Sequence, residues 1–198
     1  MKELVIATKN KGKIKEIQAA FQHIGVRVVS LLEFQEIPDA IEDGETFEEN
    51  ALIKAKFYAK LTGKACLADD SGLEVNALNG APGVYSARYA GINATDQDNN
   101  LKLLDQLHKV DGIGSKARFR CVLAFVDTNG KTILCDGSCE GVILDKERGH
   151  GGFGYDPLFL TEKLNKSMAE ITLEEKNQIS HRGAALKLMA KELADYIK

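Results

Sequence analysis

The stretch LVIATKNKGKIKEIQAAFQHIGVRVV, residues 4–29, contains the pattern that decides the fold class. It opens with a short apolar run over 4–7, which is typical of a buried strand. Apolar residues then recur every three or four positions, at Ile14, Ile17, Phe21 and Ile24. This spacing predicts an amphipathic helix that Gly25 ends, and the valine-rich residues 26–29 predict a second strand. Strand, loop, helix and strand in this order indicate an α/β fold.

Two later helices are predicted from the residues that would cap them. The sequence TFEE at 46–49 is a capping box, which predicts a helix that runs to Leu61 and stops at Gly63. We expect its apolar side to consist of Phe47, Ala51, Ala55 and Tyr58. Thr95 is the expected N-cap of a further helix over 95–107, with Asp98 at its third position.

Between these two helices the sequence ACLADD, residues 65–70, is read as a short strand followed by a pair of acidic residues. We expect the strand to end at Ala68, because two adjacent carboxylates are unfavourable inside a buried strand. Asp69 and Asp70 would then lie at its carboxyl end. Further along the chain, we expect a glycine-rich loop over 149–154 and a closing helix near 180–197.

A β-hairpin is predicted late in the chain. Residues 119–126 and 132–135 are strand-like runs separated by a turn with the sequence Asn129-Gly130. Residues 137–144 are expected to add another strand. Early alternation of strands and helices with a late hairpin predicts an α/β fold with a mixed, twisted sheet flanked by helices.

The composition is close to that of ordinary soluble proteins. The chain has 198 residues, of which 44% are hydrophobic and 28% charged, so we expect a single domain over 1–198. No stretch reaches the roughly 20 apolar residues of a membrane helix, and no signal peptide is recognised, so the cytoplasm is the expected location. The formal net charge of −3 disfavours nucleic acid as a partner, because nucleic-acid-binding domains usually carry a basic stripe. The four cysteines are interpreted as buried or half-buried free thiols.

The loop TKNKGK, residues 8–13, is the first candidate site because it lies between a predicted strand and a predicted helix. A helix N-terminus offers free N–H groups to an anion, Gly12 allows close approach and Lys13 adds a positive charge. The loop lacks the GxxxxGK[ST] pattern of a Walker A motif. It is therefore either a phosphate-binding loop or a solvated lysine cluster.

Acidic residues form the second candidate site. Carboxylates beside phosphates are the usual ligands of Mg²⁺, and in open α/β sheets ligands bind at the carboxyl ends of strands. Asp69 and Asp70 fit both descriptions, although a turn in which one of them caps the backbone remains open. The acidic run IEDGE, residues 41–45, is a second possible source of metal oxygens and otherwise a solvated loop.

Two late motifs could recognise a base. GHGGFGYDP, residues 149–157, presents aromatic rings on a flexible loop, and such rings can stack on a base while Asp156 accepts from a base N–H. EEKNQISHRGAALK, residues 174–187, places basic residues at the start of a helix, which a bound anion or polar base would compensate. The alternatives are a turn with core-anchoring aromatic residues and ordinary surface charge.

Taken together and in order, these motifs resemble the inosine triphosphate pyrophosphatase family, the pyrophosphatases of non-canonical purine nucleoside triphosphates. The similarity covers residues 4 to about 190, and DDSGL, FGYDP and SHR are its most specific parts. The resemblance implies Mg²⁺-dependent hydrolysis of ITP, dITP and XTP to the monophosphate and pyrophosphate. It also implies an elongated two-lobed fold with the active site in the cleft between the lobes, and a homodimer.

The resemblance also implies roles for individual residues. Asp70 matches the general base and a metal ligand, and Glu42 matches the second metal carboxylate. The triphosphate would be held by Thr8, Lys9, Asn10, Lys11, Gly12, Lys13 and Lys54, with Ser71 as a further substrate contact. The base pocket would be lined by Phe153, Gly154, Tyr155, Asp156, Lys176, His181 and Arg182.

Two alternative functions stay open at this point. The same phosphate and metal residues would serve a pyrophosphatase that acts on other modified or canonical (d)NTPs. A non-catalytic nucleotide-binding module is the other alternative, although such a module needs no general base.

Overall fold

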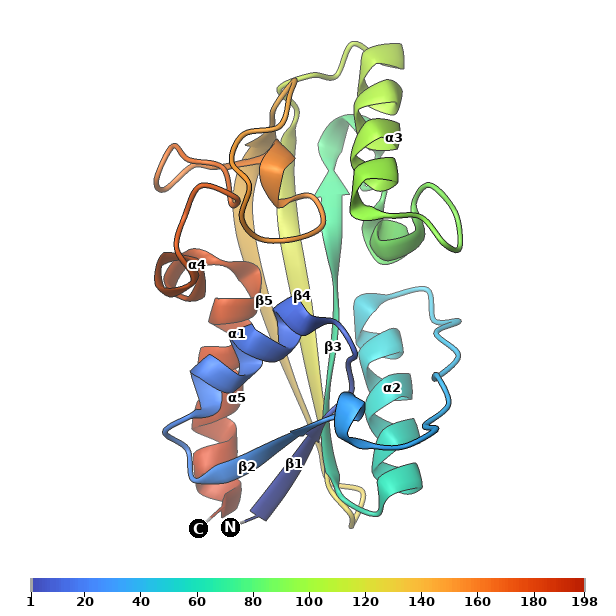
Figure 1. Cartoon of the computed structure of the whole chain (residues 1–198), viewed down its shortest axis with the longest axis vertical. Helices are drawn as coiled ribbons and strands as arrows, with labels where there is room; N and C mark the ends of the chain where they lie inside the picture. The colour runs from blue at the N-terminus through green and yellow to red at the C-terminus, as the bar shows by residue number, and fades with distance from the viewer. Residues whose placement is uncertain (1, 198) are drawn as a thin grey trace. The chain divides into compact units, whose positions relative to one another are not determined.

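The computed structural model describes residues 2–197 of the chain, and the side chains of residues 3–194 (Figure 1). Its strands are β1 (Lys2–Ile6), β2 (Val26–Ser30), β3 (Ala65–Val75), β4 (Lys116–Val126), β5 (Thr132–Ile143) and β6 (Phe159–Thr161). Its α-helices are α1 (Lys11–Phe21), α2 (Phe47–Thr62), α3 (Asp96–Lys109), α4 (Leu173–Ile179) and α5 (His181–Ile197). Among these helices none is long and apolar enough to cross a membrane.

The strands form one six-stranded mixed sheet in the order β2-β1-β3-β4-β5-β6. β1 is parallel to both β2 and β3, with Leu4 opposite Ala65, whereas β5 and β6 are antiparallel. The prediction of an α/β fold with a mixed sheet is confirmed. The expectation of a separate strand over 137–144 is wrong, because β5 runs without interruption from Thr132 to Ile143.

The chain divides into two compact units. The first unit consists of Met1–Asp70, Cys121–Gly137 and Arg182–Lys198, and the second of Ser71–Arg120 and Ser138–His181. Strands β3, β4 and β5 each contribute residues to both units. The sequence motifs therefore fall into two groups, which are described separately below.

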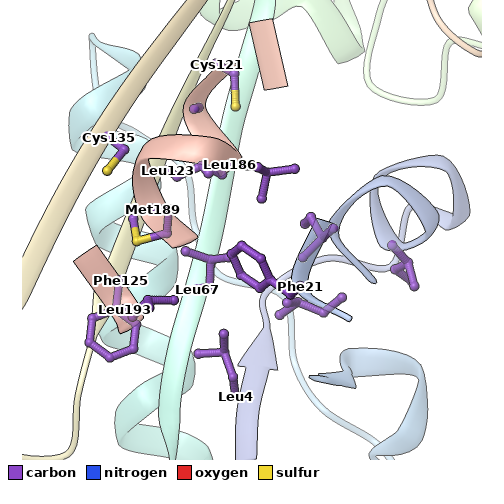
Figure 2. Close-up of a cluster of buried hydrophobic side chains, with 14 residues drawn as sticks. Leu4, Phe21, Leu67, Cys121, Leu123, Phe125, Cys135, Leu186, Met189 and Leu193 are labelled. Atoms are coloured by element: carbon purple, nitrogen blue, oxygen red, sulfur yellow. The ribbon is translucent and has the colours of Figure 1, made fainter. Parts of the chain in front are cut away.

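A hydrophobic core organises the first unit (Figure 2). Its buried members come from α1, α5 and the strands β1, β3, β4 and β5, and they include Phe21, Leu67, Phe125, Leu186 and Met189. Figure 1 shows α2 on the other side of β3 from α1 and α5. The four predicted apolar residues of α2 are all buried, and Gly63 ends the helix at φ 64°, as predicted.

The second unit has its own core, formed by β3 beyond Asp70, α3, β4, β5 and β6. Leu73, Leu103, Phe119, Tyr155 and Phe159 are among its buried side chains. Helix α3 begins as predicted, with Thr95 as N-cap and Asp98 completing the capping box. Short α4 was not predicted, although Thr172 and Glu175 form a capping box in front of it that the sequence displays. The closing helix begins at His181, as predicted.

Strand β3 is longer than predicted. It continues through Asp69 and Asp70 to Val75, so the two carboxylates lie inside an 11-residue strand rather than at its end. Their side chains are only 1% and 11% exposed. Buried charges of this kind require charged or hydrogen-bonding partners, and the structure supplies them from elements distant in sequence.

Candidate active site

Asp69 is the centre of a buried charge network in the first unit. Its Oδ2 atom accepts from Arg182 Nε at 2.7 Å and from the Cys121 thiol at 3.1 Å, and its Oδ1 accepts from the Lys13 ammonium. Burial alone would raise the pKa of Asp69, but the positive charges of Arg182 and Lys13 outweigh it and hold the pKa well below its usual value. Asp69 is therefore ionised across the physiological range.

Arg182 joins this network to helix α1. One Nη atom of its guanidinium donates to Glu16 Oε2 at 2.5 Å while Nε donates to Asp69. The Arg182 side chain is 2% exposed, so its guanidinium is buried beside these carboxylates, and its contact with a base stays a prediction. Glu16 lies three residues after Lys13, hence on the same side of α1, and the sequence reasoning missed it. An acidic residue three positions after Lys13 was the feature of the sequence that could have indicated this role for Glu16.

Asp70 belongs to a second cluster, with Lys54 and Glu42. The Lys54 ammonium donates to Asp70 Oδ1 at 3.0 Å and to Glu42 Oε2 at 2.6 Å. Burial raises the pKa of Asp70 above its ordinary value, although Lys54 acts in the opposite direction. Burial also acts to lower the pKa of Lys54, but Asp70 and Glu42 reverse this and raise it. The structure thus brings together the three residues that the resemblance had assigned to metal and phosphate.

The second oxygen of Asp70 is suited to bind a cation. Asp70 Oδ2 is buried and makes no hydrogen bond in the described structure, whereas buried acceptors are normally paired. Glu42 is 32% exposed and shares Lys54 with Asp70, so both carboxylates are available to a hard divalent ion that prefers oxygen ligands. Among the described residues no group of three or more His, Cys, Asp or Glu side chains could hold a metal by itself. Two carboxylates plus substrate oxygens is the arrangement typical of Mg²⁺.

The loop over 8–13 leads into α1, and some of the backbone N–H groups at the start of this helix already have hydrogen-bond acceptors within the loop. Asn10 is the N-cap, and its Oδ1 accepts from the N–H groups of Gly12 and Lys13 at 2.8 and 3.1 Å. We had expected these N–H groups to be free for an anion, and the cap explains why they are not. Thr8 Oγ1 accepts from Asn10 N, and the Lys9 ammonium pairs with Asp39 at 2.7 Å. Lys11 is exposed at the start of the helix.

The second unit holds the aromatic group of predicted site residues. The Lys176 ammonium lies 4.6 Å from the centre of the Phe153 ring and donates to Asp156 Oδ2 at 2.5 Å. The same oxygen accepts from Phe153 N at 2.9 Å. A side chain at Gly152, which has φ 73°, would collide with Asp156 Oδ2 at 2.1 Å. The loop is therefore built around the Asp156 carboxylate, while the Phe153 ring stays partly exposed.

Other predicted base-pocket residues are held by the core of this unit. Tyr155 is buried and its hydroxyl donates to the Ser86 carbonyl at 2.8 Å. The His181 ring is buried and stacks on Phe119, with ring centroids 4.8 Å apart. Ser71 is half-buried in β3, directly after Asp70. These contacts give Tyr155 and His181 packing roles, and their contact with a base stays a prediction.

Comparison with known proteins matches this arrangement to one family. The family model described as Ham1 matches residues 4–192. The chain belongs to the Ham1 family. A protein from Geobacter sulfurreducens, named dITP/XTP pyrophosphatase, is 52% identical to it over 98% of this chain and 97% of its own length. A protein of the same name from Bacillus anthracis is 47% identical over 99% of this chain and 98% of its own.

Solved structures show the same fold. The structure of a HAM1 protein from Coxiella burnetii is similar to this chain with a TM-score of 0.89 and 44% identity, over 98% of this chain and all of that one. The Ham1 protein of Staphylococcus aureus gives a TM-score of 0.86 at 44% identity, with the same coverage of both chains. The Ham1 fold thus provides the framework that positions both groups of side chains described above.

Proposed function

We propose that this Ham1 family member hydrolyses dITP, ITP and XTP to the nucleoside monophosphate and pyrophosphate, which removes these nucleotides from the pool. In the reaction a water oxygen forms a bond to the α-phosphorus, the bond from that phosphorus to the oxygen bridging to the β-phosphate breaks, and pyrophosphate leaves. The names of the relatives from Geobacter sulfurreducens and Bacillus anthracis support the substrate class.

The environment of Asp70 is the observation that carries the proposal. A buried carboxylate that keeps an unpaired oxygen beside the Lys54 ammonium is positioned to accept a hydrogen bond from a water molecule. We propose that Asp70 accepts the proton that the attacking water loses. Its neighbour Asp69 is unsuitable, because its pKa is lowered and its oxygens are engaged by Arg182, Lys13 and Cys121.

Glu42 and Asp70 would hold Mg²⁺ in this proposal. When bound, the ion supplies charge neutralisation on the phosphate oxygens and lowers the pKa of nearby water. Lys54 and Lys13 neutralise further charge on the departing pyrophosphate. We assign the remaining triphosphate contacts to the loop over 8–13 and to Ser71.

We assign recognition of the base to the second unit. Phe153 offers a partly exposed ring for stacking, and the buried Lys176 and Asp156 beside it supply a donor and an acceptor. Hypoxanthine and xanthine present an acceptor at O6, where adenine presents a donor, so a pocket with a donor at that point favours them. Tyr155 and His181 complete this proposed group, and the described contacts of Arg182 lie with carboxylates of the first unit instead.

Two further assignments complete the proposal. We propose that the chain functions as a homodimer and that it acts in the cytoplasm. Size-exclusion chromatography with light scattering, together with localisation of a tagged chain, tests them.

The deciding experiment measures pyrophosphate release from ITP, dITP, XTP, GTP, ATP and dTTP, each with Mg²⁺ and with EDTA. The proposal requires kcat/KM for ITP and XTP at least about 100-fold above that for ATP, a discrimination available to buried polar groups that the wrong base leaves unpaired. Equal rates on all six would favour a general (d)NTP pyrophosphatase. Binding without pyrophosphate release would favour the nucleotide-binding module.

A further inference from the structure

Helix α3 holds the glycine-rich loop by the backbone of one residue, Gly154. The Gly154 N–H donates to Asp96 Oδ2 at 2.7 Å, and the Gly154 carbonyl accepts from Asn100 Nδ2 at 3.2 Å. Asp96 and Asn100 are four residues apart, so they lie on the same side of the helix. Both hydrogen-bonding groups of Gly154 are therefore fixed by a single rigid element of the second unit.

Neither side chain is needed to form the helix. Thr95 caps α3 and Asp98 completes the capping box, so the Asp96 carboxylate is free for the loop. Asn100 is buried, and its Oδ1 atom makes no hydrogen bond in the described structure. An unpaired buried acceptor is unfavourable, and an apolar side chain at position 100 would avoid it. Stability of the helix does not explain why asparagine is there.

Gly154 lies between the residues to which we assign the base. Phe153 precedes it, and the Phe153 N–H donates to Asp156 Oδ2 at 2.9 Å. In turn the Asp156 N–H donates to the Phe153 carbonyl at 3.3 Å. Asp156 and Lys176 therefore close this short turn from one side, and α3 fixes it at Gly154. The direction of the partly exposed Phe153 ring depends on both sets of contacts.

We propose that Asp96 and Asn100 are specificity-determining positioning residues. By fixing the Gly154 peptide they set the orientation of Phe153 and Asp156 toward the purine base. The inference rests on the proposed function, because it deepens the assignment of this loop to base recognition. Neither residue touches the reacting phosphate groups in this account, so both act on the choice and affinity of substrate rather than on the chemical step.

Two variants and a matched control test the proposal. Asp96→Ala removes the acceptor of the Gly154 N–H, and Asn100→Leu removes the donor to its carbonyl together with the Asn100 hydrogen bond to Glu147 Oε1. Asp105→Ala is the control, because Asp105 lies on the same helix but pairs with Lys109, at the surface. We expect each test variant to raise the KM for ITP about tenfold with kcat within about threefold of wild type, and to lower the ITP-to-GTP ratio of kcat/KM about tenfold. Asp96→Asn, whose amide oxygen still accepts, should restore most of that ratio, and the control should match wild type.

The proposal is overturned if folded Asp96→Ala keeps the wild-type ITP-to-GTP ratio within twofold. Asp96 is exposed, so this variant is expected to fold even if Asn100→Leu does not. Failure of the proposed function looks different, since wild type itself would then release no pyrophosphate or would release it equally from all six nucleotides. In that case the affinity for IMP, measured by calorimetry on wild type, Asp96→Ala and Asp105→Ala, decides the question. An affinity that Asp96→Ala leaves unchanged refutes the positioning role, and a tenfold loss confined to it supports the role.

Discussion

Asp69 and Asp70, adjacent in one strand, are driven in opposite directions by their surroundings: the pKa of Asp69 is lowered and that of Asp70 is raised. Adjacent residues of a strand point to opposite faces, so each carboxylate meets different partners. Asp69 meets two cations and a thiol, whereas Asp70 meets one shared ammonium and keeps an oxygen unpaired. The two adjacent acids thus lie in different electrostatic environments, and the catalytic role proposed above concerns Asp70 alone.

The first prediction concerns Asp70→Asn. We expect kcat for ITP to fall by about 10²-fold or more, the usual scale for loss of a general base. Because the amide keeps the shape of the carboxylate, the unfolding temperature should change little, and thermal unfolding checks this. A variant within a few fold of the wild-type rate would rule out Asp70 as the base.

The second prediction concerns the buried network around Arg182. Arg182→Met leaves Glu16 without this partner and Asp69 without one of its two cations, and breaking a buried ion pair from one side costs about 3–5 kcal/mol. Urea unfolding measures the loss. Arg27→Met is the matched control, because Arg27 pairs with Glu3 but its side chain is 61% exposed; its effect should be small. If the two variants lost the same free energy of unfolding, the buried network would stabilise the chain no more than an exposed ion pair does.

The third prediction concerns how the free energy of unfolding changes at acidic pH. The pKa of Asp69 is lower in the folded chain than its unfolded value of about 4, so the unfolded chain binds the proton more readily. The stabilisation by Asp69 is therefore complete above pH ~4 and is lost as the pH falls through the folded value. We expect the free energy of unfolding to fall more steeply with acid in wild type than in Asp69→Asn, as urea titrations from pH 6 to 3 would reveal. Parallel curves would contradict the ionised state of Asp69.

The fourth prediction concerns Lys54. Its ammonium lies between Glu42 and Asp70 and neutralises part of their charge. In Lys54→Met the two carboxylates would attract a divalent ion without that competition, so Mn²⁺ should bind the substrate-free chain about tenfold more tightly, as followed by electron paramagnetic resonance. Hydrolysis of ITP should fall at the same time, because the phosphate contact proposed for Lys54 is lost. Lys60→Met, at the exposed end of α2, serves as the control, and unchanged Mn²⁺ affinity in Lys54→Met would argue against this site.

The fifth prediction concerns the glycine-rich loop. Gly152→Ala combines a positive φ, which costs about 1–2 kcal/mol for an L-residue, with a collision against Asp156, which adds about 1–3 kcal/mol. Gly130→Ala, in the turn between β4 and β5, has φ 85° but open space around it, so it should show the first cost alone. Thermal unfolding compares the two variants. An equal loss of stability would mean that the loop can rearrange around Asp156 without measurable cost.

The sequence was informative where the signal is local. Caps at Thr46 and Thr95 and the glycine stop at Gly63 involve residues within one helical turn or just beyond a helix end, so pattern alone located both helices. The length of β3 could not be predicted in this way. Two carboxylates indicate a strand end unless their partners are known, and those partners come from positions 13, 54, 121 and 182. Glu16 and the α3 contacts to Gly154 were missed for the same reason.

The thiol of Cys121 also has a practical consequence. It is completely buried, donates to Asp69, and has a pKa raised well above its ordinary value by burial and then by that carboxylate. Because alkylating reagents react with the thiolate, Cys121 is protected for as long as the first unit stays closed. Cys66, whose pKa burial raises to about 12, is protected in the same way. The rate at which these two cysteines become labelled therefore measures how often the core around strands β3 and β4 opens.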